Sequence, residues 1–334
     1  MKLGLVMSVR DEAAILRQNL LYHRHAGVDI VYLYDDGSKD GTLGSIRDLA
    51  FVRLPERTSP DTFGAAAEPY AARAAVDQCS RQTLNAFAAV AEARRDGIEW
   101  LLHLDADEFA SPSLDAATEG GLRELLGSMP PAVSAVRFPT CEMVQRRLEY
   151  EDVTTEETLF KRPGARIARM VQDPLRDRSW QLEGFYGHSF GKSAVRLSEG
   201  VRPHGVHKFA AADGSELATE RRGCLLHYWA HGFSDFRRKH RLTGPLSTYP
   251  TGPPVAAHVR LWRELAHNAD FSEDALRDYF ARFVLFSADE VARLRRRGRR
   301  FGLFPVEAAI IEITAVRDAL ARLGLLDTPG APGG

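Results

Sequence analysis

Three carboxylates follow a short apolar run near the end of the first third of the chain. Asp105, Asp107 and Glu108 lie within four residues, directly after the apolar run Trp100–Leu104. Carboxylates this close raise one another's pKa unless a cation offsets their charge. Hard divalent cations prefer oxygen ligands, and Mg²⁺ often bridges protein carboxylates and substrate phosphates. The pattern favours a metal site that holds a phosphorylated substrate, with a solvated acidic turn as the simpler alternative.

These acidic residues need a fold that brings them together. The first part of the chain alternates between short apolar runs typical of strands and segments with helical spacing. Expected strands cover 3–8, 30–34, 51–54 and 100–104, and expected helices cover about 12–25 and 82–95. This alternation predicts an α/β fold with a doubly wound, parallel sheet. Ligands bind beyond the carboxyl ends of such strands, which is where Asp35, Asp36 and the acids after Leu104 lie.

The pattern is looser in the rest of the chain. A strand is expected at 132–138, and residues 180–228 are rich in Gly, His and aromatic side chains. In the last hundred residues, the pattern predicts helices at about 234–241, 256–267, 273–286, 288–297 and 305–323. The final residues, rich in Pro and Gly, have the composition of a frayed tail.

Composition excludes several classes of protein. The 334 residues include 44 Lys plus Arg and 45 Asp plus Glu, so no global charge favours nucleic acid or anionic membrane. The three cysteines are far apart and lack metal-ligand spacing, which fits free thiols in a reducing compartment. There is no basic-then-apolar leader and no run of 18 apolar residues. We therefore expect a cytoplasmic protein.

Three short motifs occur in order at the ends of successive expected strands. They are Ser8–Glu12, Tyr34–Thr42 and Leu104–Phe109. With them the chain resembles the family 2 glycosyltransferases of GT-A fold, and in particular the bacterial branch with a DxDEF signature. The resemblance covers about residues 1–112 well, and 180–241 more weakly. It implies a Rossmann-like, mostly parallel central sheet flanked by helices, with a helical C-terminal region.

The resemblance also implies a division of the chain. Residues 1–112 would form the nucleotide-sugar-binding half of the GT-A domain, and 113–241 would form its acceptor-side half. A helical C-terminal region would cover 242–326, and 327–334 would be a flexible tail.

The first two motifs would bind the donor. By resemblance, Ser8, Arg10 and Glu12 line the nucleotide base and ribose. Glu12 near a helix N-terminus also suits simple helix stabilisation. Asp36, or its neighbour Asp35, would accept a hydrogen bond from the base.

The third motif would bind the metal. In the family pattern Asp107 ligates Mn²⁺ or Mg²⁺ directly, and Asp105 contacts the ribose or completes the shell through water. A histidine from the carboxyl half would complete the site, with His227 the first candidate and His207 the second. Lys192 would hold phosphate oxygens, with a solvated basic side chain as the alternative. A packed or surface imidazole is the alternative for either histidine.

An inverting transfer needs a general base for the acceptor hydroxyl. Glu183 is the first candidate because Trp180 and Tyr186 flank it and could stack on a sugar ring. Glu142 and Asp177 are alternatives. A structural salt bridge would explain any of these carboxylates equally well.

The sequence thus predicts a metal-dependent, hexosyltransferase-like glycosyltransferase, by resemblance inverting. It would move a sugar from a nucleoside diphosphate donor, by resemblance a UDP-sugar, to a glycan or lipid-linked glycan in bacterial surface glycan or glycoconjugate synthesis. The basic segment Arg293–Arg300 would allow peripheral contact with the inner membrane, with a solvated helix end as the alternative, and no fold cue supports nucleic acid.

Two other functions remain open from the sequence. A metal-dependent hydrolase would combine the His-rich carboxyl half with Asp105 and Asp107. A non-catalytic sugar-nucleotide-binding protein would keep the fold and bind the nucleotide without consuming it.

Overall fold

The computed structural model describes residues 1–56, 58–114, 120–167, 169–173, 178–182, 184–242, 257–296, 298–300 and 304–325. The chain forms two compact units. Unit 1 comprises Met1–Thr140, Phe190–His227 and Ile313–Gly334, and unit 2 comprises Cys141–Ser189 and Tyr228–Glu312. The units interleave along the chain, whereas the expected segments 1–112, 113–241 and 242–326 are contiguous, so that functional division stays a prediction. Among the described residues, no helix is long and apolar enough to cross a membrane.

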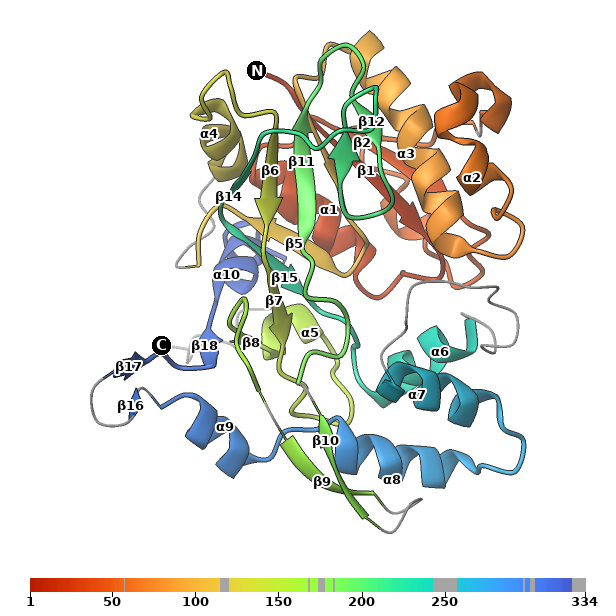
Figure 1. Ribbon diagram of the computed structural model, residues 1–334. Helices are drawn as coiled ribbons and strands as arrows, with labels where there is room; N and C mark the ends of the chain where they lie inside the picture. Colours follow the sequence, from red (N-terminus) through yellow and green to blue (C-terminus); the bar gives the residue numbers. More distant parts are fainter. Residues whose placement is uncertain are drawn as a thin grey trace, which may run out of the picture. The chain divides into compact units, whose positions relative to one another are not determined.

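Unit 1 is built on a seven-stranded sheet in the order β14-β6-β11-β4-β1-β2-β3 (Figure 1). The strands are β1 (Leu3–Val9), β2 (Ile30–Asp35), β3 (Val52–Arg53), β4 (Trp100–His103), β6 (Ala135–Phe138), β11 (Lys192–Arg196) and β14 (Thr219–Arg221). Strands β3, β2, β1 and β4 run parallel, β14 runs parallel to β6, and β11 is antiparallel to both β4 and β6. The predicted α/β class with a mostly parallel sheet is confirmed.

Unit 1 also contains helices, several of which connect its strands. They are α1 (Leu16–His25), η1 (Gly44–Ile46), η2 (Pro60–Ala66), α2 (Glu68–Ala71), α3 (Gln78–Arg95), α4 (Gly121–Gly127) and α10 (Ala315–Arg322). Helix α3 begins where the Asp77 carboxylate accepts hydrogen bonds from the N–H groups of Cys79 and Ser80, a cap worth about 1 kcal/mol. Its buried stripe, which includes Ala89 and Val90, packs on strand residues such as Val6 and Leu101.

Two further strand pairs belong to unit 1. Strand β5 (Glu108–Ser111) pairs antiparallel with β15 (Cys224–His227), and β12 (Arg202–Pro203) pairs antiparallel with β13 (Phe209–Ala210). Helix α1 fixes the segment before β5, because the Asn19 amide donates to the carbonyls of Ala106 and Glu108 at 2.9 and 2.7 Å. Helix α1, which lies near the start of the chain, therefore helps to position the acidic residues, which lie near residue 105.

Unit 2 combines short strands with helices. The strands are β7 (Thr140–Met143), β8 (Leu159–Lys161), β9 (Arg169–Asp173), β10 (Arg178–Leu182), β16 (Gly298–Arg300), β17 (Phe304–Val306) and β18 (Ile310–Glu312). The helices are α5 (Val153–Glu156), α6 (Phe233–Leu242), α7 (Ala257–His267), α8 (Glu273–Phe283) and α9 (Ala288–Leu294). Its core is aromatic, with Trp229 stacked on Trp262 at a ring-centroid distance of 6.0 Å.

The prediction of a helix over 305–323 is wrong for the first half of that segment. Strand β17 includes Pro305, and β18 pairs antiparallel with β8 through Ile310, Ile311 and Glu312. Proline has no N–H for a helical hydrogen bond, and adjacent β-branched isoleucines favour a strand. Only the second half is helical, as α10.

Candidate active site

The acidic loop connects the end of β4 to the start of β5, and Glu108 is the first residue of β5. The Glu108 carboxylate lies inside this loop, fully buried, and accepts a hydrogen bond from the Asp105 N–H at 2.8 Å. The side chain of Asp105 accepts from the Gln82 amide of α3 at 3.0 Å. The loop is thus held by its own glutamate from within and by α3 from one side, which leaves little freedom for its carboxylates.

A buried lysine lies between two of the carboxylates. The Lys192 ammonium is 2.8 Å from Asp105 and 3.1 Å from Glu108, and its side chain is fully buried. Burial lowers the pKa of Lys192, but the two carboxylates outweigh burial and raise the pKa above its usual value. Burial also raises the pKa of Asp105, and the negative charges of Glu108 and Asp107 raise it further, against the opposing effect of Lys192. One ammonium therefore lies against two carboxylates of a loop that carries a third, Asp107.

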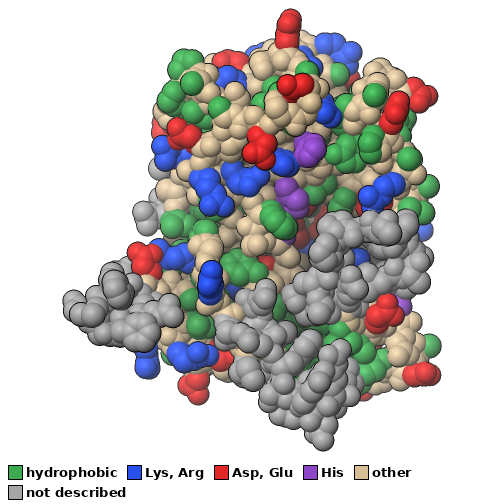
Figure 2. All heavy atoms as spheres, in the orientation of Figure 1, with side chains coloured by type: hydrophobic (Ala, Val, Ile, Leu, Met, Phe, Trp, Pro, Cys, Tyr) green, Lys and Arg blue, Asp and Glu red, His purple; other side chains and the backbone are tan. Residues whose placement is uncertain are grey.

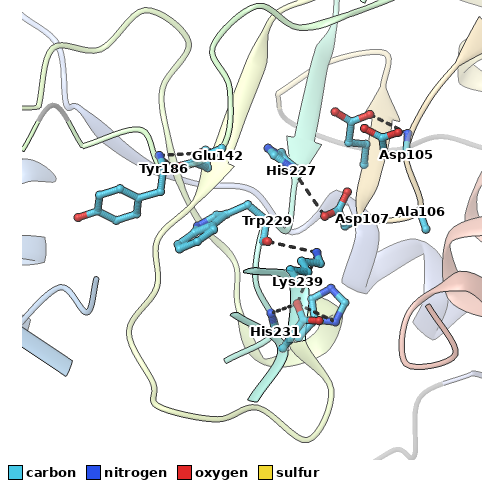
Figure 3. Close-up of polar contacts among 12 residues, drawn as sticks. Asp105, Ala106, Asp107, Glu142, Tyr186, His227, Trp229, His231 and Lys239 are labelled. Carbon is cyan, nitrogen blue, oxygen red and sulfur yellow. Dashed lines mark hydrogen bonds and ion pairs between the residues drawn. The ribbon is translucent and has the colours of Figure 1, made fainter. Parts of the chain in front are cut away.

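Asp107 and His227 lie side by side (Figure 3). The β5–β15 register places His227 opposite Glu108, and the His227 Nε2 atom is 3.8 Å from an Asp107 carboxylate oxygen. A carboxylate oxygen and an imidazole nitrogen each bind a first-row divalent ion at about 2.0–2.2 Å. Two such atoms 3.8 Å apart can share one ion, and the excess negative charge of the loop favours a cation there. The residues present fit a divalent metal.

His207 lies on the segment that leads into β13. Its Nδ1 atom is 3.1 Å from the carbonyl oxygen of Gly191, and its ring contacts Phe190. These contacts hold the backbone just before Lys192. A role for His207 as a metal ligand stays a prediction.

The two loops expected to bind the nucleotide are tied together. The Asp11 N–H donates to the Ser38 hydroxyl at 2.9 Å, and the Glu12 N–H donates to the Thr42 hydroxyl at 2.8 Å. Asp11 has a positive φ of 56°, a conformation that non-glycine residues rarely adopt. The turn after β1, which carries Arg10, is therefore fixed by the turn after β2.

The two aspartates after β2 have different partners. The carboxylate of Asp35 accepts hydrogen bonds from the N–H groups of Gly37 and Ser38, which stabilises the turn. Asp36 forms an ion pair with Arg81 of α3 at 2.8 Å. Asp35 thus shapes the loop, while Asp36 presents a carboxylate already engaged by a cation.

Sequence reasoning missed the polar side of α3. Gln82 bonds Asp105, Arg81 bonds Asp36, and the Asn85 amide donates to the Ser8 hydroxyl at 2.9 Å. Arg81 and Asn85 also line a cavity of about 340 Å³. Asn85 comes four positions after Arg81 and three after Gln82, beside the apolar stripe, and that spacing is the signal that could have identified them.

Of the three general-base candidates, only Glu142 is among the described residues. Glu183 and Asp177 lie outside the described residues. Glu142 is fully buried, and its oxygens accept from Lys161 and from the N–H groups of Tyr186 and Gly187 (Figure 3). Tyr186 is itself buried against Trp229. Glu142 and Tyr186 are therefore well placed to hold the core of unit 2 together.

The basic segment Arg293–Arg300 is only partly described, because residue 297 lies outside the described residues. Arg293 lies in the last turn of α9, and Arg295 forms an exposed ion pair with Glu312 at 3.2 Å. A contact of this segment with anionic lipid stays a prediction.

The chain has relatives among curated proteins. It is 28% identical over 249 residues to a glycosyltransferase-like protein of Arabidopsis thaliana, a match that covers 72% of this chain and 53% of that protein. A second glycosyltransferase-like protein of the same plant is 32% identical over 162 residues, which is 46% of this chain and 30% of that protein. The matches thus span about half or less of these relatives. No family model matches the chain.

Several crystal structures are similar in part. Staphylococcus aureus TarS 1–349 has a TM-score of 0.34 at 13% identity, covering 80% of this chain and 72% of that one. Mycobacterium tuberculosis glucosyl-3-phosphoglycerate synthase, in complex with Mn²⁺ and UDP-glucose, has a TM-score of 0.31 at 15% identity, covering 76% and 80%. These scores are low, so the functional assignment rests on the sequence relatives and on the residues of this chain.

Proposed function

We propose that the chain is a metal-dependent glycosyltransferase that transfers a sugar from a nucleoside diphosphate, specifically a UDP-sugar, to a hydroxyl acceptor. Its similarity to two glycosyltransferase-like proteins supports the sugar-transferring class. The observation that carries the proposal is the pairing of Asp107 with His227 at 3.8 Å, in a loop that holds three carboxylates within four residues. This arrangement combines ligands for a divalent cation with the strand ends where an α/β sheet binds its ligand.

The residues of the loop have separate roles in this proposal. Asp107 and His227 would hold Mn²⁺ or Mg²⁺, with His207 as the alternative imidazole. Such an ion, when bound, neutralises the diphosphate of the donor and acts as a Lewis acid toward the leaving group.

Lys192 was expected to contact phosphate, but its ammonium lies on Asp105 and Glu108. We therefore assign Lys192 a positioning role. It contacts one oxygen of the Asp105 carboxylate and the Gln82 amide donates to the other, so that together they fix its orientation. An Asp105 held in this way can accept a hydrogen bond from a ribose hydroxyl or from water.

The donor's nucleoside would lie against the two linked turns. Ser8 lies near the end of β1, and Arg10 and Glu12 lie in the turn after it. Asp35 ends β2, and Asp36 begins the turn after it. Because hydrogen bonds join the turns, their polar groups are preorganised, and less conformational entropy is lost on binding. Arg81 orients the Asp36 carboxylate as an acceptor for an imide N–H.

The remaining details are proposals by resemblance alone. They are inversion at the anomeric carbon, Glu183 as general base, a glycan or lipid-linked glycan acceptor, and a cytoplasmic location with a role in bacterial surface glycan synthesis. The curated relatives described above are plant proteins, so the bacterial setting depends on the DxDEF pattern.

The proposal is tested with Asp107→Asn, an isosteric change that removes one charge. We expect at least a hundredfold loss of UDP-sugar consumption, roughly the effect of removing one strong electrostatic contact from an active site, with an unchanged circular dichroism spectrum. Asp48→Asn is the matched control, because Asp48 forms an exposed ion pair with Arg17 away from the loop. Near-normal turnover of Asp107→Asn with Mn²⁺ supplied would show that the metal assignment is wrong.

The same assay separates the alternatives. A transferase consumes donor only with an acceptor, or slowly with water, whereas a hydrolase releases free sugar at full rate without one. Thermal stabilisation by UDP without any donor consumption would instead indicate a non-catalytic binding protein.

A further inference from the structure

A cavity of about 300 Å³ lies in unit 1 between the outer strands of the sheet and the segment that carries β12 and β13. Its charged lining residues are Arg137 on β6, Arg221 on β14, and Lys208 and Glu216 on the segment above them. Three cations thus face one carboxylate. None of these residues belongs to the proposed donor or metal site.

The two arginines are placed side by side by the sheet. In the parallel pair β6–β14, Arg137 lies directly opposite Arg221, and in the antiparallel pair β6–β11 it lies opposite Ser193. Neighbouring strands are about 4.8 Å apart, so residues in one cross-strand row share a face of the sheet. Like charges directly opposite each other destabilise a sheet. Arg221 is exposed and Arg137 is half-buried, so water screens part of their repulsion, and a bound anion would offset the rest.

The protein itself offers these arginines little compensation. Among the described residues, neither Arg137 nor Arg221 has a carboxylate partner, and the Arg137 Nε atom is buried without an acceptor. Glu216 is paired with Lys208 at 3.6 Å, and its side chain is 91% exposed, so solvent screens most of its charge. Native structures rarely leave a buried donor without an acceptor.

The same strand separates this cavity from the acidic loop. Side chains alternate between the faces of a strand, so Lys192 and Ser193 point to opposite faces of β11. Lys192 reaches the acidic loop, and Ser193 lines the cavity. In Figure 2, Lys and Arg side chains gather on the face over β6 and β14, which agrees with a separate basic site.

From this juxtaposition we infer that the cavity binds a small molecule carrying a phosphate group, which Arg137 and Arg221 grip together. Guanidinium groups match the geometry of phosphate oxygens and form strong charge-assisted hydrogen bonds with them. The cavity volume is at the lower end for small-molecule sites, which suits a phosphate with a few carbon atoms. A concave site of this size fits such a molecule better than the extended backbone of a nucleic acid.

The test uses glycerol 3-phosphate as the probe, measured by isothermal titration calorimetry in EDTA. We expect wild-type protein to bind it, and we expect Arg137→Gln and Arg221→Gln each to weaken binding by about tenfold, the scale of one charge-assisted contact. Arg222→Gln is the matched control. Arg222 is the next residue after Arg221, does not line the cavity, and pairs with Glu220 at 2.7 Å. Glycerol without the phosphate should not bind.

Stability gives a second readout that does not depend on affinity. Without ligand, Arg137→Gln should melt at or above the wild-type temperature, because it relieves the repulsion between the two arginines. With glycerol 3-phosphate, wild-type protein should be stabilised more than this variant. A clear loss of ligand-free stability in Arg137→Gln would contradict the proposal, because it would mean that the arginine holds the fold together.

Other outcomes would also overturn the inference. One is a wild-type protein that does not bind the probe at about 10 mM, a concentration about ten times the dissociation constant of even a weak, millimolar site. A second is an equal loss of affinity in Arg222→Gln. A third is binding of phosphatidylglycerol vesicles that depends on Arg137 while the probe itself fails to bind. Because the test uses EDTA, it is independent of the proposed metal site, and Asp107→Asn should bind the probe like wild type.

Discussion

Two fully buried lysines in this protein are held in different ways. Lys161 in unit 2 meets one carboxylate, that of Glu142, at 2.5 Å. Lys192 in unit 1 meets both Asp105 and Glu108. Burial lowers the pKa of Lys161 and a single carboxylate does not offset it, whereas two carboxylates raise the pKa of Lys192 despite the same burial.

The balance of charge explains why only one of these places is suited to a cation. Glu142 faces one ammonium and accepts additional backbone hydrogen bonds from Tyr186 and Gly187, so its negative charge is offset. In the acidic loop, Lys192 offsets one of three carboxylates, and Asp107 lies beyond it next to His227. A balanced pair stabilises a core, while an unbalanced cluster leaves net negative charge for a bound ion.

The largest expected effect comes from removing each lysine's charge. Lys192→Met leaves two neighbouring carboxylates without their ammonium, and we expect it to lower the free energy of unfolding by about 5 kcal/mol, at the upper end for a broken buried pair. Lys161→Met leaves one carboxylate with its backbone donors, and we expect about 3 kcal/mol, at the lower end of the same range. Urea denaturation monitored by circular dichroism measures both values.

Double variants control for the loss of packing. Lys161→Met with Glu142→Gln removes both charges of the pair and should recover most of the lost stability. Lys192→Met with Glu108→Gln still leaves Asp105 and Asp107, so it should recover less. Equal recovery in the two double variants would show that the acidic loop has no excess charge.

The next effect is stabilisation by a divalent ion. Mn²⁺ at about 100 times its dissociation constant should stabilise wild-type protein by about 2.7 kcal/mol. The increase in melting temperature should disappear in Asp107→Asn and persist in Lys161→Met, whose changed side chain lies in the balanced pair. If Mn²⁺ raises the melting temperature of Asp107→Asn as much as that of wild type, the ion binds elsewhere.

The sequence predicted the elements that depend on local patterns. The runs 30–34 and 100–104 are strands because their apolar residues are contiguous, and acidic residues follow them directly. The surroundings of Lys192 could not be predicted in this way. Its strand β11 inserts antiparallel between β4 and β6, and Asp105 lies 87 positions away in the chain. Contacts of this kind depend on sheet order, which no local pattern reveals.

One prediction failed, and one set of contacts was not foreseen. Pro305 to Leu323 has helix-like spacing, but pairing of Ile310 and Ile311 with β8 decides its first half. The polar side of α3 resembles a solvent face in the sequence because its partners, such as Asp105, are distant along the chain. In the first case the proline and the β-branched isoleucines also favour a strand locally, and in the second the partners are distant along the chain.

The smallest predicted effect concerns His23, a buried base whose hydrogen-bond partners are all neutral. His23 in α1 is buried, its Nε2 atom accepts from the Ala110 N–H at 3.2 Å, and its Nδ1 atom donates to the Asn19 carbonyl at 2.9 Å. Burial lowers the pKa of His23 from 6.5 to about 4. Burial therefore favours the neutral form of this imidazole, whereas each lysine has a carboxylate partner for its charged form.

The pH dependence of stability follows from that shift. Between pH 6.5 and pH 4 the unfolded state binds a proton at this histidine and the folded state does not, so stability falls as the pH falls. From about pH 7.5 to about pH 5 the contribution is about 2 kcal/mol. His23→Gln should lose that part of the pH dependence in urea denaturation, and His25→Gln on the same helix is the control. If His23→Gln and wild type lose the same stability over this range, the buried imidazole is charged in the folded protein, and burial alone does not decide which basic groups keep their protons.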